Sequence, residues 1–271
     1  MKKGKQKALA VVLACVMLAG CGAGGGATEN SSSPDSGSSR DTITIGLGGT
    51  ISNLDAKEGV VEQSMSVYSI AGESLLKMVS GENGLPVMTT ENSITDSYEL
   101  DEENSGIIYH LKEGVPMQVG TELNADDVVA SVMHMQDGTY YADVDYDNVY
   151  AVDEYTVFVG VQELGQPVIN KVSTIPIWSK EAYDEAGNEG VFFTEGYVSC
   201  GQYQITGWVS GDSVTLEAFD DYYNGKPQIE NVIFRIFSET SVAMMELQTG
   251  GVDVLMSPDY QSYQDVADGT Y

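Results

Sequence analysis

The sequence contains few cysteines. Of the three, Cys15 and Cys21 lie close to the N-terminus and only Cys200 lies further along the chain. A lone cysteine cannot form an internal disulfide, so the folded part must be stabilised by its hydrophobic core. This excludes the class of small, disulfide-stabilised secreted proteins.

Basic residues are also scarce. The chain has 12 Lys and Arg against 41 Asp and Glu, which gives a formal net charge of −29. Four lysines fall within the first seven positions, so residues 21–271 hold eight basic and 41 acidic residues, a net charge of −33. No basic stripe is available to displace counterions from a nucleic acid, which excludes that partner. The many acidic residues are explained by a solvated exterior, which favours solubility outside a cell. The alternative explanation is that the protein binds a cationic cargo.

Only two histidines occur, His110 and His134. Neither has cysteine or carboxylate neighbours at metal-ligand spacing, and we expect both to have structural or surface roles. No Ser-His-acid or Cys-His order indicates a nucleophile. Adjacent acids point apart in regular structure and are poor glycosidase pairs, which applies to Glu102-Glu103, Asp126-Asp127 and Asp220-Asp221. We therefore expect no catalytic residue, no cofactor and no metal site.

The apolar run at residues 8–19 is too short for a membrane span, which needs roughly twenty residues. Lys2, Lys3, Lys5 and Lys7 precede it, and this order of charge and apolar residues predicts an export signal over residues 1–20. The run ends in Leu18-Ala19-Gly20-Cys21, which resembles the lipobox of bacterial lipoproteins. That resemblance implies lipidation of Cys21, and two acyl chains there would anchor the chain stably. An ordinary signal peptide with a chance cysteine is the alternative.

Residues 21–40 are rich in Gly and Ser and show no apolar periodicity, which predicts a flexible tether. The remaining 41–271 are enough for one large domain or two small ones. Alternation predicts strands, two of them joined in a hairpin around Gly211-Asp212. Helical spacing with capping residues predicts helices, one of which has Gly187 at its end. The predicted strands are 42–47, 92–100, 106–111, 148–152, 155–161, 202–209, 213–219, 228–237 and a buried strand at 252–256; the predicted helices are 64–79, one opened by Asn124, 179–186 and 238–249.

Five stretches in order resemble the family 5 extracellular solute-binding proteins, which bind oligopeptides, dipeptides, nickel chelates and some sugars. The chain departs from the family pattern at Met117-Gln118-Val119-Gly120, where the family has an "F-x-D-G" turn. The five stretches are Asn53-Leu54-Asp55; Tyr109 to Val115 with Thr121 to Val129; Ile175 to Lys180; Gly201-Gln202-Tyr203 with Trp208, Gly211 to Leu216 and Asp221 to Pro227; and Leu247 to Val254.

The resemblance implies a mixed α/β fold, a lobe of the class II periplasmic-binding-protein type with an extra β-rich subdomain. We expect residues 41–80 and 200–271 to form the core of lobe one, and residues 81–199 to form the inserted subdomain. In the family a second lobe follows the "L-x-x-G-x-x-D" strand, so we expect that lobe to be missing here and the chain to be part of a longer protein.

The resemblance also implies ligand-binding residues. In the oligopeptide subgroup an extended peptide pairs with the backbone at the stretch matching Glu58-Gly59-Val60, although this stretch also fits a plain loop turn. An aromatic residue from the region of Tyr140 and Tyr141 closes over the ligand in the family, and packing is the alternative for both. We expect further ligand contacts near the crossing of the chain and the hinge, from Cys200, Gly201, Gln202, Met256 and Asp259.

The implied function is capture of peptides, as a monomeric lipoprotein on the extracytoplasmic face of the membrane, for an ABC permease and its ATPase. A nickel chelate or a sugar as cargo, a sensing role without import, and a truncated fragment without function remain open. An acidic secreted carbohydrate-active enzyme is the alternative from another class, and no motif supports it.

Overall fold

The computed structural model describes residues 41–58, 62–81, 83–256, 258 and 260–267. The expected signal, the tether and Cys21 lie outside these residues. Among the described helices, none combines the length and the apolar character that crossing a bilayer requires.

A five-stranded sheet brings the two ends of the described chain together. Its order is β10-β11-β12-β1-β13, with β1 parallel to both β12 and β13 and the β10–β12 strands antiparallel. The bounds are β1 (Thr42–Gly48), β10 (Tyr203–Val209), β11 (Ser213–Ala218), β12 (Asn231–Phe237) and β13 (Val254–Met256). The strands predicted at 42–47, 202–209, 213–219, 228–237 and 252–256 therefore lie in one sheet.

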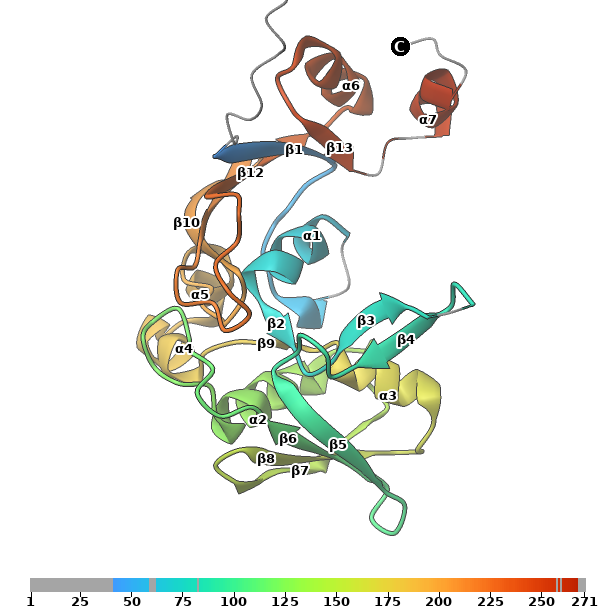
Figure 1. Cartoon of the computed structure of the whole chain (residues 1–271), viewed down its shortest axis with the longest axis vertical. Helices are drawn as coiled ribbons and strands as arrows, with labels where there is room; N and C mark the ends of the chain where they lie inside the picture. Colours follow the sequence, from blue (N-terminus) through green and yellow to red (C-terminus); the bar gives the residue numbers. More distant parts are fainter. Residues whose placement is uncertain (1–40, 59–61, 82, 257, 259, 268–271) are drawn as a thin grey trace, which may run out of the picture. The chain divides into compact units, whose positions relative to one another are not determined.

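One face of this sheet packs on a large core, and helix α6 (Thr240–Thr249) covers part of the other face. The alternation in β1 sends Ile43, Ile45 and Leu47 into a large core with Val232 and Phe234 of β12. On the other face Gly46 lies against Phe237 and Val252, beneath helix α6, which lies beside β1 and β13 (Figure 1). β13 is shorter than predicted and only partly buried, with Val254 41% exposed.

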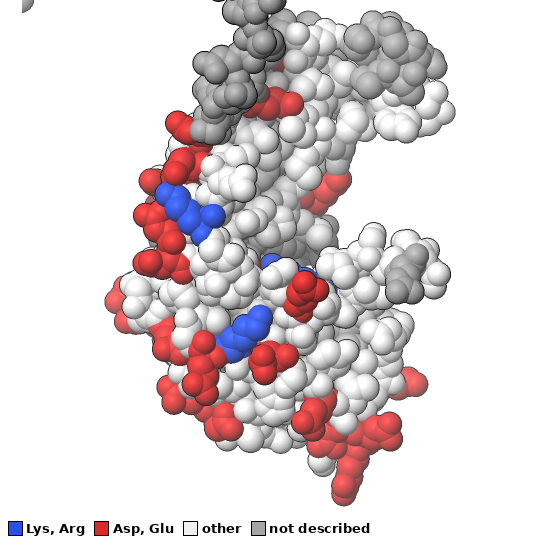
Figure 2. All heavy atoms as spheres, in the orientation of Figure 1, with Lys and Arg blue, Asp and Glu red and all other residues white. Residues whose placement is uncertain are grey.

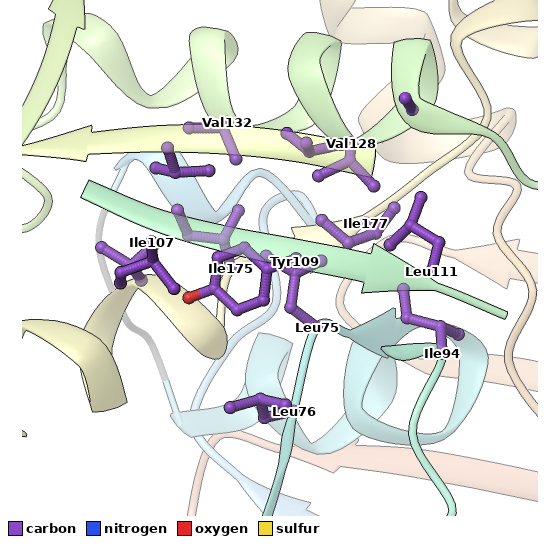
Figure 3. Packing of buried hydrophobic residues seen from close by; sticks show 14 of the residues in the cluster. Leu75, Leu76, Ile94, Ile107, Tyr109, Leu111, Val128, Val132, Ile175 and Ile177 are labelled. Atoms are coloured by element: carbon purple, nitrogen blue, oxygen red, sulfur yellow. The ribbon is translucent and has the colours of Figure 1, made fainter. Parts of the chain in front are cut away.

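A second sheet of four antiparallel strands has the order β5-β6-β8-β7. Helix α2 (Ala125–His134) begins with the predicted cap. The Asn124 side chain accepts from the backbone amide of Asp126, and the Asp127 carboxylate accepts from the backbone amide of Asn124. Figure 3 shows Ile107, Tyr109 and Leu111 of β6 among residues of α2 and of the 175–177 segment. The strands are β5 (Thr95–Asp101), β6 (Gly106–Leu111), β7 (Val144–Asp153) and β8 (Thr156–Val161).

Along the chain, the remaining elements lie between the strands of these two sheets, except for the last helix, which follows them. The hairpin predicted around Gly211-Asp212 is present, as is the helix stopped by Gly187, which has a φ of 62°. The other elements are η1 (Ala56–Glu58), α1 (Glu62–Ala71), β2 (Glu73–Ser74), β3 (Lys77–Ser80), β4 (Pro86–Thr89), η2 (Met135–Asp137), α3 (Gln166–Ser173), β9 (Pro176–Ile177), α4 (Lys180–Ala186), α5 (Glu189–Glu195) and α7 (Tyr260–Ala267).

The helix predicted over residues 64–79 is wrong in its second half. Helix α1 ends at Ala71, and the chain continues through Gly72 into β2 and β3. Leu75 and Leu76 are fully buried in the core of the four-stranded sheet from this extended segment. The spacing of Leu75 and Leu76 from Met65 fits one face of a helix. Both are buried, however, because the extended segment between β2 and β3 places them in this core.

Two large cores divide the described chain. The first contains the four-stranded sheet and α2, and the second lies against the five-stranded sheet. Trp178, Phe192, Phe193 and Tyr197 belong to the second core although they fall inside the range 81–199 expected for the inserted subdomain. The domain boundaries stay a prediction.

Candidate functional site

The segment leading to the predicted peptide-pairing stretch is held by local bonds. The Asn53 side chain accepts from the amide of Asp55 at 3.0 Å, and Asp55 accepts from the amide of Lys57 at 2.9 Å. These two turns carry the chain into η1, which ends at Glu58. Gly59 and Val60 lie outside the described residues, as does the side chain of Glu58.

Residues 138–143, between η2 and β7, carry Tyr140 and Tyr141, and we call them the tyrosine loop. This loop lies next to η1. A Cβ on Gly138 would lie 3.0 Å from the carbonyl oxygen of Lys57, so the loop after η2 runs close to η1. Tyr140 is 46% exposed, and its ring meets Tyr141 edge-on at 4.9 Å. Tyr141 is only 3% exposed and belongs to the first core. The Tyr140 side chain is therefore open to solvent, whereas the Tyr141 ring is engaged in packing.

A pocket of about 290 Å³ lies between α1, β2, β3 and the segment before β9. Met65 and Met78 at its wall are 40% and 54% exposed, and we call it the methionine pocket. Burial raises the pKa of Tyr68 to about 12, and the neighbouring Tyr140 adds to this. Its lining includes Met65, Tyr68, Ser69, Glu73, Lys77 and Met78.

Glu73 is the buried acid of the methionine pocket. It forms an ion pair with Lys77 and accepts from the Tyr222 hydroxyl at 2.8 Å. Burial raises the pKa of this carboxyl, and the two partners offset only part of the shift. Glu73 is thus fixed to the wall by partners of its own.

Three lysines lie in η1, in the methionine pocket and near Tyr140. Lys57 lies 3.7 Å from Glu189, Lys77 pairs with Glu73, and Lys171 pairs with Asp143 while lying 5.3 Å from the centre of the Tyr140 ring. Figure 2 shows acidic side chains spread widely over the visible face, with few Lys or Arg among them. Each of these three lysines is therefore paired with an acidic side chain.

The predicted ligand residues Cys200 and Gly201 have packing positions. Cys200 is fully buried in the first core, where burial raises the pKa of its thiol. A Cβ on Gly201 would lie 2.4 Å from the carbonyl carbon and oxygen of Ala71, at the end of α1. Gln202 is half-buried, and its carbonyl accepts from the amide of Phe219 at 2.9 Å. Among the three, only Gln202 has a side chain within reach of solvent.

Gln118 was missed by sequence reasoning. Its side-chain amide donates to the carbonyls of Ala71, Gly201 and Tyr203 at 3.2, 3.1 and 2.9 Å. Its side-chain oxygen accepts from the amide of Ser199 at 3.2 Å. Gln118 thus holds the end of α1 against the start of β10, and the only signal was its unexplained place in a departure from the family turn.

The last two predicted ligand residues, Met256 and Asp259, were expected near the hinge. Met256 ends β13 and packs, half-buried, against the second core. Asp259 lies outside the described residues.

The family described as bacterial extracellular solute-binding proteins, family 5 Middle, matches residues 89–270, more than half of the chain. The oligopeptide-binding protein AppA of Bacillus subtilis is 26% identical over 177 residues, which cover 60% of this chain and 33% of that protein. The glutathione-binding protein GsiB of Escherichia coli is 25% identical over 173 residues, with the same coverage.

Solved structures share the mixed α/β fold. The structure of OppA from Burkholderia pseudomallei superposes with a TM-score of 0.71 at 16% identity, over 85% of this chain and 48% of that one. The chain thus spans about one third of the curated relatives and about half of this solved relative. The two curated relatives are named as binding proteins and not as enzymes.

Proposed function

Because this chain belongs to the family 5 bacterial extracellular solute-binding proteins, we propose that it contributes the cargo-contacting surface of a protein that captures peptides for an ABC importer. The family match over residues 89–270 is the observation that carries this proposal. Peptide is favoured over the other cargoes of the family because the two matched relatives are named for oligopeptides and for glutathione, itself a peptide.

The proposed binding mode starts from the backbone. An extended peptide would pair with Glu58, Gly59 and Val60, which provides affinity without reading side chains. Tyr140 would cover the ligand with a flat apolar face and a polar tip. A peptide side chain would enter the methionine pocket, because the flexible thioethers of Met65 and Met78 adapt to many shapes.

Methionine methyl groups provide the test. With methyl-labelled methionine in the full chain, millimolar oligopeptide should shift the NMR signals of Met65 and Met78 and leave those of Met117 and Met135 in place. The last two are internal controls because they are at most 1% exposed in the first core. The substitutions Met65→Leu and Met78→Leu assign the two signals.

The same titration separates the cargo classes. A nickel chelate or a sugar that shifts Met65 and Met78 where peptides fail would replace peptide as the cargo. If no candidate solute shifts either methyl group, the cargo-binding proposal is wrong. We expect weak peptide affinity for a chain spanning about half of its solved relative, and submicromolar binding would contradict that expectation.

We further propose that Cys21 anchors the chain to the outer face of the cell membrane, where it works as a monomer beside the permease. This rests on the Leu18-Ala19-Gly20-Cys21 stretch, which lies outside the described residues. Two acyl chains on this cysteine bind a membrane stably, whereas one chain binds marginally.

Replacing Cys21 with serine should move the chain from the membrane fraction to the soluble fraction and abolish incorporation of labelled palmitate. Cys15→Ser is the matched control, since Cys15 lies inside the expected signal and should leave both readouts unchanged. A Cys21→Ser chain that keeps its label and its membrane fraction would refute the anchor.

A further inference from the structure

Three metal-ligating side chains from separate elements meet beside η1. Asp55 precedes η1, His134 ends α2, and Glu189 begins α5. His134 Nε2 lies 3.0 Å from Asp55 Oδ1 and 3.9 Å from Glu189 Oε1. All three ligand atoms lie within 4.8 Å of one another.

Two of these side chains are buried and fixed in orientation. The side chains of His134 and Asp55 are 7% and 4% exposed. Phe193 stacks on the imidazole at 4.9 Å, and Trp178 meets it edge-on at 5.8 Å. Asp55 Oδ1 accepts from the Lys57 amide at 2.9 Å and lies 3.0 Å from His134 Nε2. The Asp55 carboxylate is therefore held in a preformed position.

Glu189 differs from the other two because it is open to solvent. Its side chain is 45% exposed, so it can pivot. Asp55 and Glu189 both line a pocket of about 310 Å³ with Ser52, Asn53 and Thr194. This pocket offers a route from solvent to the two carboxylates and room for water.

We propose that Asp55, His134 and Glu189 form a binding site for a divalent transition-metal ion of the zinc type. One imidazole nitrogen with carboxylate oxygens suits zinc and similar ions, whereas calcium and magnesium prefer oxygen ligands alone. Ligand atoms around a tetrahedral zinc ion are separated by about 3.3 Å, given metal–ligand distances near 2.0–2.1 Å. The observed 3.0 and 3.9 Å bracket this value, and rotation of Glu189 supplies the remaining adjustment.

The charges around the site fit an added cation. Asp55 and Glu189 are two negative groups, and Lys57 Nζ lies 3.7 Å from Glu189 Oε1 as the available positive group. A metal ion would take Glu189 from Lys57, and water from the pocket would complete its coordination. Lys57 thus competes with the metal ion for the Glu189 carboxylate, so removing the charge of Lys57 should strengthen metal binding.

The metal would join three segments that are far apart in sequence. Asp55 lies three residues before the end of η1, and the other ligands belong to α2 and α5. Coordination would therefore fix the entry to η1 against both helices, and ligand binding of this kind stabilises the folded state. Nothing in this site requires a bound cargo.

Titration calorimetry of the full chain with zinc chloride, after chelator treatment and removal, tests the site. We expect one zinc ion per chain, with Glu189→Gln weakening the affinity about tenfold or more. Glu195→Gln is the matched control, because this exposed acid lies on the same helix and changes the charge equally. Lys57→Gln should bind zinc more tightly than the unchanged chain.

The readouts distinguish the site from general attraction of zinc to an acidic surface. Equal zinc affinity in Glu189→Gln and Glu195→Gln would overturn the proposal, as would the absence of binding at millimolar zinc. If Glu189→Gln fails to fold, Lys57→Gln decides: unchanged or weaker affinity overturns the site. A rise in melting temperature with zinc that Glu195→Gln keeps and Glu189→Gln loses would support it.

Discussion

Replacing Gly201 with alanine should lower the free energy of unfolding by about 3 kcal/mol, the upper end for overpacking a close contact. The added Cβ would lie 2.4 Å from the carbonyl carbon and oxygen of Ala71 and 2.7 Å from the amide nitrogen of Gly72. These are backbone atoms, so no side-chain rotation relieves the clash. Moving the two segments apart would also break the hydrogen bonds from Gln118 to the carbonyls of Ala71 and Gly201.

Gly207→Ala is the matched control for this prediction. Gly207 lies six positions further along, and its added Cβ would meet Thr215 at 3.7 Å, an ordinary contact. We expect this variant to stay within about 1 kcal/mol of the unchanged chain in urea unfolding followed by circular dichroism. Equal stability of the two variants would contradict a packing role for Gly201 and return it to the candidate ligand residues.

Local signals predicted several elements correctly. The cap formed by Asn124 and Asp127 depends on residues three positions apart, and the hairpin at Gly211-Asp212 depends on its own turn. The end of α4 at Gly187 likewise depends only on residues close to it in the sequence. Such features are visible in sequence because every residue that decides them lies within one short window.

The end of α1 could not be predicted in this way. Gly201 packs against Ala71, and the Gln118 side chain donates hydrogen bonds to the carbonyls of both residues. The end of the helix therefore depends on residues far along the chain. His134 and Asp55 are likewise 79 positions apart, and spacing within the sequence cannot reveal their contact. Long-range contacts overrode the helical spacing that favoured a longer helix.

The candidate ligand residues illustrate the same limit on a smaller scale. Tyr140 and Tyr141 are adjacent and chemically identical, yet one is 46% exposed and the other 3%. The difference arises from the turn after η2, which directs one ring to Lys171 and the other into the first core. Sequence identified the region and could not choose between its two rings.

Replacing Phe192 with alanine should cost about 4 kcal/mol of folding free energy, the range for truncating a fully buried aromatic ring. Phe192 is fully buried, and its ring contacts Trp178 at 5.4 Å and Phe193 at 4.9 Å. It shares the second core with Leu47 of β1 and Phe234 of β12. The loss should therefore be felt in the five-stranded sheet, although Phe192 lies within the range 81–199.

Native-state hydrogen exchange can locate the damage, because it reports stability segment by segment. In Phe192→Ala the amides of β1 and β12 should exchange faster than those of β5, β6 and β8. Ile107→Ala is the counterpart, since Ile107 is a fully buried residue of the first core, and it should reverse this order. If Phe192→Ala accelerates only the four-stranded sheet, residues 81–199 form an independent unit; if both variants accelerate both sheets equally, the two cores unfold as one.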